Sequence, residues 1–389
     1  MRIVVAPDSF KGSISAAEAA NAIEMGIRKA FGGLRVDKVP MADGGEGTVE
    51  ALVMAAGGRI VDKRVMDPLG VQIDSFYGIL GDGVTGVVEL AAASGLPLVP
   101  SDKRNPMLTT TYGTGELIRA AVDAGCRKLI VGIGGSATND GGTGLLQALG
   151  VRFLDAAHKK LGFGGQMLGN IHTIDVSGLH QSIRNVEIIA ACDVSNPLCG
   201  PKGAAHTYGP QKGATAEMIE LLDRGLQNFS DRLLMDFGKD VGNIPGSGAA
   251  GGVGCGLVAF LDAKLKPGMD IMKQVTAIED KIRQAQLVIT GEGRTDFQTA
   301  FGKVPAGVAR LAKKHGIPVV CLSGSIGEGT EQLYETGITA MFSITDGPIK
   351  LEDAMLNASA LIEKAAENII RLYVNQRKAC LKKQAFKSF

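Results

Sequence analysis

The pattern of apolar residues at the N-terminus predicts a strand, a helix and a second strand. Residues 3–6 form a mostly β-branched run that ends at a proline, which is typical of a buried strand. Ser15 and Glu18 have the spacing of a capping box, and apolar residues then recur on one helical face as far as Ala30. A second strand is predicted at residues 35–39. This order favours a parallel sheet flanked by helices.

The pattern then changes to three apolar runs that are joined by short turns. Because the turns at 67–70 and 81–83 are rich in glycine, proline and aspartate and are too short for a parallel crossover, the runs should form antiparallel strands. These three predicted strands are residues 59–66, 71–80 and 84–90. After residue 285 strands and helices alternate again. Strands are predicted at 287–290, 318–322 and 340–344, and helices at 306–314 and 331–334.

Neither end of the chain has enough strands for a full sheet, whereas two N-terminal and three C-terminal strands together would make one. We therefore predict a discontinuous domain formed by residues 1–65 and 285–389. Residues 66–284 would be inserted into it as a second, mixed α/β domain. The predicted fold class is α/β, with two domains.

Composition narrows the classes of function. The chain has 41 lysines and arginines against 40 aspartates and glutamates, so it lacks the sustained basic face that nucleic-acid and membrane-surface partners require. Six scattered cysteines without a C-x-x-C pair argue against zinc and against a disulfide scaffold. With no signal peptide recognisable at the N-terminus, a reduced, cytoplasmic protein is expected. The only basic cluster, from Arg371 to Lys387, is predicted to be the solvated end of a C-terminal helix.

Glycine is the unusual feature, with 54 of 389 residues, about twice the average usage. The glycines gather at predicted strand-to-helix junctions, beside acids, amides, hydroxyls or lysines. At such junctions the backbone can approach a ligand closely, and a helix N-terminus can bind an anion. The clusters are residues 8–13, 43–48, 132–142, 246–252 and 291–296, and a further segment contains 192–197 and 209–213.

Phosphoryl transfer accounts for this mixture of residues. Backbone N–H groups hold phosphate oxygens, a lysine or arginine neutralises developing charge, and acids hold Mg²⁺. A further carboxylate can accept the proton of the attacking hydroxyl. The chain has no P-loop, because Gly302-Lys303 is followed by valine, and it lacks the H-R-D and D-F-G sequences of protein kinases. The expected phosphotransferase therefore belongs to neither of these classes.

The alternative hypothesis is an NAD(P)-dependent oxidoreductase that acts on a small hydroxy acid. Gly132, Gly134 and Ala137 match the dinucleotide-binding fingerprint after a predicted strand, and Asp155 follows at about the required distance. Residues 246–251 contain a second match. Chance matches are expected in so glycine-rich a chain, and an NAD turn does not need the polar residues found here. A solute-binding protein is a third hypothesis, which the missing secretion signal disfavours.

The glycine-rich segments closely resemble those of the type 1 glycerate kinase family of bacteria. The resemblance runs from Arg2 to about Ile344 and includes ADGGEGT (42–48), GIGGSATNDGG (132–142), CDVSNPL (192–198), GPQKGA (209–214) and ITGEGRTD (289–296). It implies phosphorylation of D-glycerate by ATP with Mg²⁺, and 2-phosphoglycerate is favoured over 3-phosphoglycerate as the product. It also implies two α/β domains, one of them flavodoxin-like, with the active site in the cleft between them. The sequence is compatible with a homodimer.

The resemblance also suggests which residues form the site. The expected catalytic residues are Asp193, Lys11, Asp43 and Lys212. The lysines would neutralise phosphate or the glycerate carboxylate, and Asp193, Asp43 or Glu292 would hold Mg²⁺ or act as the base. The metal candidates are Asp193, Glu292 and Asp296. For each charged residue, the structural alternative is an ion pair that holds the loops. Binding of substrate or nucleotide is expected of Asp8, Ser9, Gly44, Gly45, Glu46, Gly134, Gly135, Ser136, Asn139, Asp140, Asn196, Gly251, Gly252 and Lys303.

Overall fold

The chain folds into two compact units in a computed structural model that describes residues 1–387, with only the backbone described for Phe301 and residues 378–387. One unit, here the discontinuous unit, contains Met1–Ala42 and Met272–Phe389, and the other, the inserted unit, contains Asp43–Ile271. These boundaries differ from those expected at 65/66 and 284/285. Residues 58–66 belong to the inserted unit because they form a strand of its sheet.

The discontinuous unit is built on a five-stranded parallel sheet with the order β13-β12-β11-β1-β2. This order corresponds to the 2-1-3-4-5 order of flavodoxin-like folds. The prediction that strands from both ends of the chain share one sheet is confirmed. The strands are β1 (Arg2–Val5), β2 (Arg35–Lys38), β11 (Leu287–Thr295), β12 (Val319–Ile326) and β13 (Ile338–Ser343).

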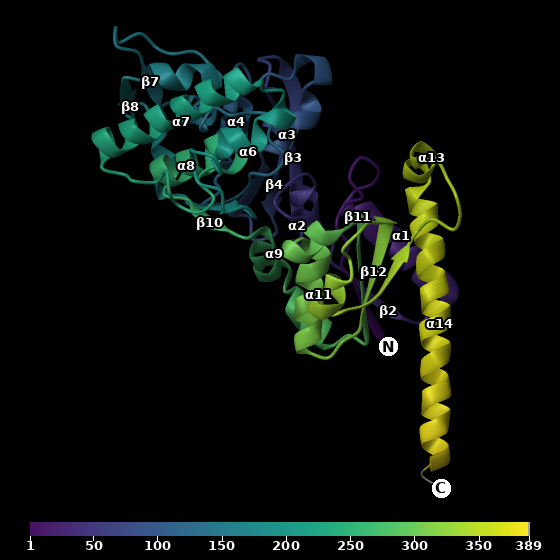
Figure 1. Ribbon diagram of the computed structural model, residues 1–389. Helices are drawn as coiled ribbons and strands as arrows, with labels where there is room; N and C mark the ends of the chain where they lie inside the picture. Colours follow the sequence, from purple (N-terminus) through teal and green to yellow (C-terminus); the bar gives the residue numbers. More distant parts are fainter. Residues whose placement is uncertain (388–389) are drawn as a thin grey trace. The chain divides into compact units, whose positions relative to one another are not determined.

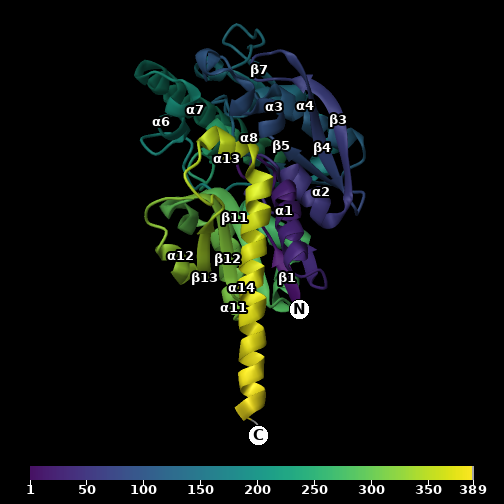
Figure 2. The ribbon, with the colours of Figure 1, turned by 90° about the vertical axis from the view of Figure 1, so that its right-hand side faces the viewer.

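Helices cover both faces of this sheet. Helices α1 (Ala16–Ala30) and α14 (Ala358–Lys387) lie side by side on one face, and α11 (Val304–Lys314) lies on the other (Figures 1 and 2). A Cβ at Gly26 of α1 would lie 2.2 Å from the carbonyl oxygen of Glu363, so only glycine permits this close approach of the two helices. The unit also contains α10 (Ile278–Arg283), α12 (Gln332–Thr336) and α13 (Leu351–Leu356).

The start of α1 and the C-terminal segment of α14 can be compared with the predictions from the sequence. The predicted capping box is present, because Ser15 Oγ accepts the Glu18 N–H at 3.2 Å and Glu18 Oε2 accepts the Ser15 N–H at 2.8 Å. The basic segment from Arg371 is helical as far as Lys387. The side chains of Lys378, Lys382, Lys383 and Lys387, which were expected to be solvated, lie outside the described side chains.

The inserted unit has a six-stranded sheet with the order β10-β9-β6-β5-β4-β3. The three predicted antiparallel strands are confirmed as β3 (Gly58–Met66), β4 (Gln72–Leu80) and β5 (Thr85–Glu89). From β5 onward the strands run parallel through β6 (Lys128–Gly132), β9 (Glu187–Ala191) and β10 (Lys264–Lys266). The carboxyl ends of these four strands therefore share one edge of the sheet. Strands β7 (Arg152–Leu154) and β8 (Thr173–Asp175) form a separate antiparallel pair.

The helices of the inserted unit enclose one large hydrophobic core. Residues 242–261 carry no charged side chain and form a loop followed by the mostly buried α8 (Ala249–Leu261). None of the helices in the described part of the chain combines the length and hydrophobicity needed to cross a membrane. The helices are α2 (Thr48–Ala56), α3 (Ala91–Ser94), α4 (Tyr112–Asp123), α5 (Thr143–Ala148), α6 (Ala204–Tyr208), α7 (Ala216–Phe237) and α8 (Ala249–Leu261), and α9 (Gly268–Thr276) crosses the unit boundary.

Candidate active site

In the discontinuous unit, polar residues gather where the strand order reverses. Strands β1 and β11 are neighbours there, and ligands of such sheets bind outside the carboxyl ends of the strands at this point. Asp8 follows β1, is 4% exposed, and donates its N–H to the carbonyl oxygen of Gly291 at 2.8 Å. The Ser9 N–H donates to Asp8 Oδ1 at 2.7 Å. Lys11, farther along the same loop, is exposed.

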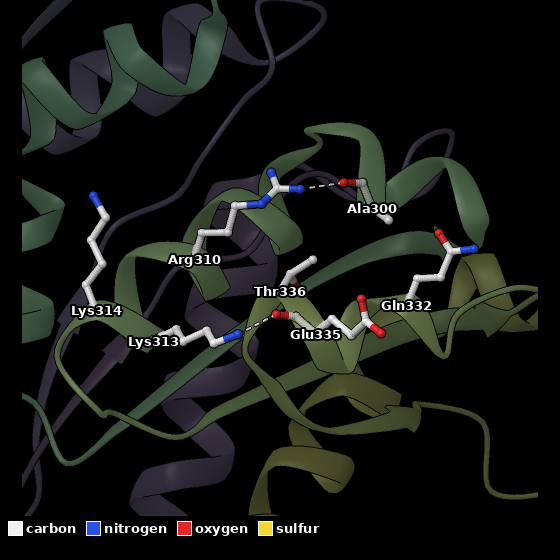
Figure 3. A pocket seen from close by; sticks show the side chains of 7 residues that line it. All are labelled: Ala300, Arg310, Lys313, Lys314, Gln332, Glu335 and Thr336. Carbon is white, nitrogen blue, oxygen red and sulfur yellow. Dashed lines mark hydrogen bonds between the residues drawn. The ribbon is translucent and has the colours of Figure 1, made fainter.

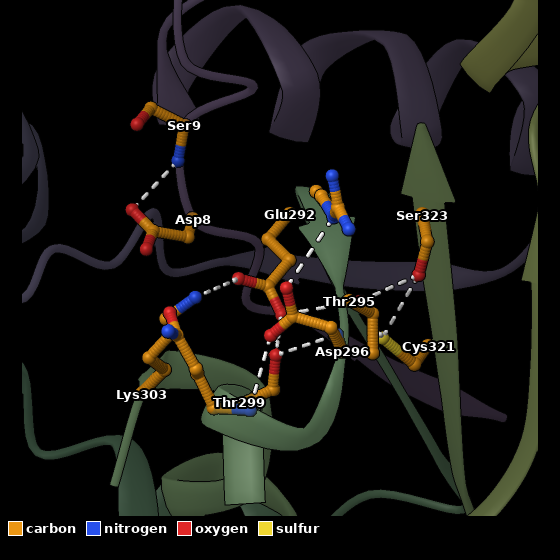
Figure 4. Close-up of polar contacts among 11 residues, drawn as sticks. Asp8, Ser9, Glu292, Thr295, Asp296, Thr299, Lys303, Cys321 and Ser323 are labelled. Carbon is orange, nitrogen blue, oxygen red and sulfur yellow. Dashed lines mark hydrogen bonds and ion pairs between the residues drawn. The ribbon is translucent and has the colours of Figure 1, made fainter. Parts of the chain in front are cut away.

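Glu292 on β11 is a buried carboxylate held by two hydroxyl groups (Figure 4). Its Oε1 accepts hydrogen bonds from Thr299 Oγ1 at 2.7 Å and from Thr295 Oγ1 at 3.1 Å. Its Oε2 lies 3.8 Å from Lys303 Nζ, and Asp8 and Lys303 lie on the same side of Glu292 in Figure 4. Burial raises the pKa of Glu292, and the hydroxyl of Thr299 and the charge of Lys303 oppose that rise.

Asp296, a predicted metal ligand, caps a short helix in the structure. It is the N-cap of the 3₁₀ helix η6 (Phe297–Phe301), where its Oδ1 accepts the Gln298 N–H at 3.0 Å. Its own N–H donates to Thr299 Oγ1 at 3.2 Å, and its Oδ2 lies 3.3 Å from Arg294 Nε. A metal ion at Asp296 would compete with these contacts, so the geometry favours the structural alternative for this residue.

In the inserted unit, the loop of residues 43–47 lies across the carboxyl ends of β6 and β9. The Gly134 N–H donates to the carbonyl oxygen of Gly44 at 3.1 Å. A Cβ at Gly44 would lie 2.7 Å from the Cβ of Ala191, and one at Gly132 would lie 2.6 Å from the carbonyl oxygen of Gly44. Glycines here let the loop pack directly on the strand ends. Within the loop, Gly45 donates its N–H to Asp43 Oδ1 at 3.2 Å, and Glu46 is exposed.

Asp193 lies two residues beyond β9, at the same edge of the sheet. Its Oδ1 accepts the N–H of Gly268 at 2.9 Å. Part of the Asp193 side chain is exposed, but its partial burial raises its pKa to about 6. The hydrogen bond from the Gly268 N–H opposes this rise, and the nearby charges of Asp43 and Asp270 add to it. Asp270 was not among the predicted site residues, because nothing in its Gly-Met-Asp context distinguishes it from a surface acid.

Lys212 is almost completely buried, at 2% exposed. Its ammonium group donates to Ser136 Oγ at 2.7 Å and to the carbonyl oxygen of Thr138 at 2.6 Å. Burial lowers the pKa of Lys212 to about 7, and the negative charge of Asp140 opposes that change. Lys212 therefore links the segment at 209–213 to the loop at 134–142.

Asp140 is fully buried and organises its own loop. Its Oδ2 accepts hydrogen bonds from the N–H and the hydroxyl of Thr111 at 2.9 and 2.8 Å and from the Gly144 N–H at 3.3 Å, while its Oδ1 accepts the Gly142 N–H at 3.0 Å. Two of these donors belong to the start of α5, so an internal carboxylate fills that helix N-terminus. Burial raises the pKa of Asp140, and these hydrogen bonds oppose the rise. This geometry favours a structural task over direct contact with a nucleotide.

Other predicted binding residues are packed against neighbouring loops. A Cβ at Gly251 would lie 2.1 Å from the carbonyl oxygen of Thr138, and one at Gly252 would lie 2.9 Å from the Cα of Gly141. Asn139 is fully buried, and within the described residues neither polar atom of its side chain has a hydrogen-bond partner. Gly135 adopts φ +72° and accepts the Leu96 N–H at 2.9 Å.

Asn196 likewise organises the loop that follows it. Its Nδ2 donates to the carbonyl oxygen of Lys202 at 2.8 Å, and its Oδ1 accepts the hydroxyl of Tyr208 at 2.7 Å. Its backbone carbonyl accepts the Gly248 N–H at 3.0 Å. The loop after β9 is therefore tied to the glycine-rich segment before α8.

The dinucleotide fingerprint lacks the structural setting that it requires. The strand after Gly132–Ala137 in the chain is β7, which pairs with β8 in a separate hairpin and not with β6. Asp155 is partly buried, and its Oδ1 accepts the N–H groups of Ala157 and Lys159 at 2.9 Å each. Because the acid is not at the end of a neighbouring parallel strand, the oxidoreductase alternative has no support.

One pocket, of about 580 Å³, lies beside α11 and contains none of the predicted site residues (Figure 3). Two of its three cations bind backbone carbonyl groups: Arg310 Nη2 donates to the carbonyl oxygen of Ala300 at 2.6 Å, and Lys313 Nζ donates to that of Glu335 at 2.7 Å. Among the residues whose side chains are described, no three His, Cys, Asp or Glu residues are grouped so that they could hold a metal ion by themselves.

Comparison with known proteins agrees with the predicted family. A model of the glycerate kinase family matches residues 3–374. The glycerate kinase of Bacillus subtilis is 52% identical over 369 residues, which cover 95% of this chain and 97% of that protein. The glycerate 2-kinase of Escherichia coli is 47% identical over 369 residues, covering 95% and 97% of the two chains.

A solved structure extends this similarity to three dimensions. The putative glycerate kinase 2 of Salmonella typhimurium LT2 superimposes with a TM-score of 0.86 at 47% identity, and the match covers 97% of this chain and 99% of that one. Since sequence, family model and fold agree over nearly the whole length, the chain belongs to the glycerate kinase family.

Proposed function

We propose that this chain transfers the γ-phosphoryl group of ATP to the 2-hydroxyl group of D-glycerate, releasing ADP and 2-phosphoglycerate. The observation that carries the proposal is the match of the glycerate kinase family model to residues 3–374. The preference for the 2-position is supported by the 47% identity to a protein named glycerate 2-kinase. Five cysteines that are free thiols in the described structure are in keeping with work in the reducing cytoplasm.

Asp193 is our proposed general base. The attacking hydroxyl must lose its proton, and a base works best when its pKa lies near the operating pH. With a pKa raised to about 6, Asp193 is ionised at neutral pH and accepts a proton more readily than an ordinary aspartate. The Gly268 N–H at 2.9 Å fixes one carboxylate oxygen and leaves the other to receive the proton. Asp43 and Asp270 help to keep this pKa high.

Lys11 and Lys303 are our proposed phosphate-binding cations, and Glu292 is our proposed protein ligand of Mg²⁺. Mg²⁺ is bound through one or two carboxylates together with substrate phosphates, so a single hard oxygen donor fits it without a complete protein cage. When bound, Mg²⁺ would neutralise charge on the phosphates. The hydroxyls of Thr295 and Thr299 orient the Glu292 carboxylate from one side. Lys212 would act by positioning Ser136 and the loop around it.

ADP release from purified protein, ATP and a panel of small hydroxy acids tests the proposed reaction. We expect turnover with D-glycerate that depends on added Mg²⁺, and much slower release with L-glycerate, lactate or glycolate. The absence of ADP release, together with NAD(P)H oxidation in the presence of hydroxypyruvate, would overturn the proposal in favour of an oxidoreductase.

The pH profile of kcat/KM should show an acidic limb set by Asp193. Because its pKa is about 6 and the base must be deprotonated to act, kcat/KM should fall as the pH drops through 6 and level off above 7. The measurement is the initial rate at low D-glycerate between pH 5 and 8, with the coupling enzymes in excess. A profile that stays flat down to pH 5 would exclude a base with this pKa.

Replacing Lys11 with alanine should lower kcat/KM by about 10²-fold, because one cation that stabilises the transferring phosphoryl group would be lost. Steady-state kinetics with each substrate varied separately measures the effect. The matched control is Lys314→Ala, which removes an exposed lysine from α11 of the same unit and should leave kcat/KM unchanged. Equal kcat/KM in Lys11→Ala and wild type would remove Lys11 from the site.

A further inference from the structure

Glu89 is a buried carboxylate at the end of β5 that none of the roles above uses. It is 2% exposed. Its Oε1 accepts the N–H of Val49 at 2.5 Å, and its Oε2 accepts the N–H of Gly47 at 3.2 Å. Both donors belong to the start of α2, one at the N-cap and one in the first turn. The two oxygens therefore accept hydrogen bonds from two N–H groups of one helix N-terminus, two residues apart.

This contact replaces a cap that the helix lacks. The N-cap residue of α2 is Gly47, which adopts φ +88° and has no side chain that could accept a hydrogen bond. Helix N-termini attract anions, because their first N–H groups are unpaired and the helix dipole is positive there. The glycine-rich sequence at 43–48 predicts that this end is open to a phosphate. Glu89 instead fills it from within the protein.

The helix start is continuous with the loop that lies over the strand ends. Thr48 Oγ1 donates to the carbonyl oxygen of Gly45 at 2.8 Å, and Gly45 in turn donates its N–H to Asp43 Oδ1 at 3.2 Å. Asp43 is one of the two acids whose charge raises the pKa of Asp193. A chain of direct contacts thus connects Glu89 with the surroundings of the proposed base.

Burial makes the ionised form of the Glu89 carboxyl group unfavourable. Burial raises the pKa of Glu89 to about 8, the Val49 and Gly47 N–H groups oppose that rise, and the neighbouring charges of Glu50 and Glu46 add to it. A serine or aspartate is the usual N-cap of a helix, but either would be strained at the φ of +88° that Gly47 adopts. Glu89 supplies the acceptor oxygens instead and ties the helix start to the end of β5.

We infer that Glu89 is a positioning residue for the phosphoryl-transfer reaction, which it serves by fixing the loop at 43–47 through the start of α2. The expected effect on kcat rests on the proposed function. The hydrogen-bond geometry also makes a prediction that does not depend on any activity, namely that the amides at 43–49 are protected because of Glu89.

The test compares Glu89→Gln with Glu50→Gln by amide hydrogen exchange and by kinetics. Glutamine keeps the size of the side chain but offers one acceptor oxygen, so exchange should accelerate in the peptide covering 43–49 and kcat should fall by about 10-fold or more. Glu50→Gln removes a charge from the same helix without removing a contact to these amides. It should leave exchange at 43–49 and kcat at wild-type values. Unchanged exchange at 43–49 in Glu89→Gln would overturn the inference.

A double-mutant cycle with Asp43→Asn separates positioning from a general loss of stability. If Glu89 acts through the loop that carries Asp43, Glu89→Gln should lower kcat much less in the Asp43→Asn background than in the wild type. If Glu89→Gln lowers kcat by the same factor in both backgrounds, Glu89 does not act through the loop that carries Asp43. If Glu89→Gln does not fold, Thr48→Val removes the second tie on this loop, and wild-type exchange and kcat in that variant would overturn the inference.

These readouts distinguish failure of the inference from failure of the proposed function. Wild-type protein that shows no turnover on D-glycerate contradicts the proposed function, whatever the exchange data show. Wild-type protein that turns over normally, with Glu89→Gln indistinguishable from it in exchange and kcat, contradicts only the role of Glu89.

Discussion

Replacing Asp193 with asparagine should lower kcat by about 10²–10⁴-fold while changing KM for D-glycerate little. Asparagine can still accept the Gly268 N–H through its carbonyl oxygen, so the loop after β9 should keep its position. What it cannot do is take a proton from the attacking hydroxyl. Steady-state kinetics at pH 8, where wild-type Asp193 is ionised, measures this loss without interference from the titration.

The control for Asp193→Asn is Asp74→Asn, which removes an exposed aspartate from β4 of the same unit. It should leave both kcat and KM unchanged. Asp193→Asn should also lose the limb of the pH profile near pH 6. Near-normal turnover in Asp193→Asn would remove this residue from the role of base, and the neighbouring acids, Asp43 and Asp270, would be the next candidates.

Asp140→Asn should destabilise the inserted unit by roughly 3–5 kcal/mol, because it breaks a buried polar network and leaves the buried Lys212 without its neighbouring negative charge. Asp140 accepts four hydrogen bonds at zero exposure. An asparagine amide would turn two N–H donors toward groups that are themselves donors. Denaturant unfolding followed by a probe in the inserted unit, alongside calorimetry, measures the effect.

The matched control is Asp155→Asn, whose aspartate also accepts two backbone N–H groups in a turn but is only partly buried. Water can satisfy the groups that this substitution leaves unpaired, so the expected loss is below about 1 kcal/mol. A loss of the same size in the two variants would show that burial of Asp140 does not set the cost. It would also contradict the structural task assigned to that residue.

The elements that the sequence predicted correctly are those encoded by neighbouring residues. The capping box of Ser15 and Glu18 starts α1, and short turns made β3, β4 and β5 antiparallel. The shared sheet followed from counting strands at both ends of the chain. The unit boundary at 42/43 differs from the predicted one because the assignment of β3 depends on its pairing with β4, which counting strands along the chain does not include.

The places of the candidate residues in the fold were more predictable from the sequence than the contacts that these residues make. Glycines and acids after β1, β6 and β9 do lie at strand ends, whereas Glu292 lies within β11, which runs to Thr295. Their contacts with one another depend on tertiary packing, which sequence does not display. Glycines such as Gly44, Gly132 and Gly251 let backbone segments approach each other, although the sequence suggested room for phosphate. Glu89 and Asp140 fill helix N-termini that the sequence suggested were open.

Phosphorus NMR of the product formed from ATP, Mg²⁺ and D-glycerate tests the proposed reaction most directly. The phosphorus of 2-phosphoglycerate couples to the single proton on C2, whereas that of 3-phosphoglycerate couples to the two protons on C3. We predict a new phosphomonoester resonance, split into a doublet, that grows in step with ADP. A triplet would contradict phosphorylation at the 2-position, and the absence of any new phosphomonoester would contradict glycerate phosphorylation altogether.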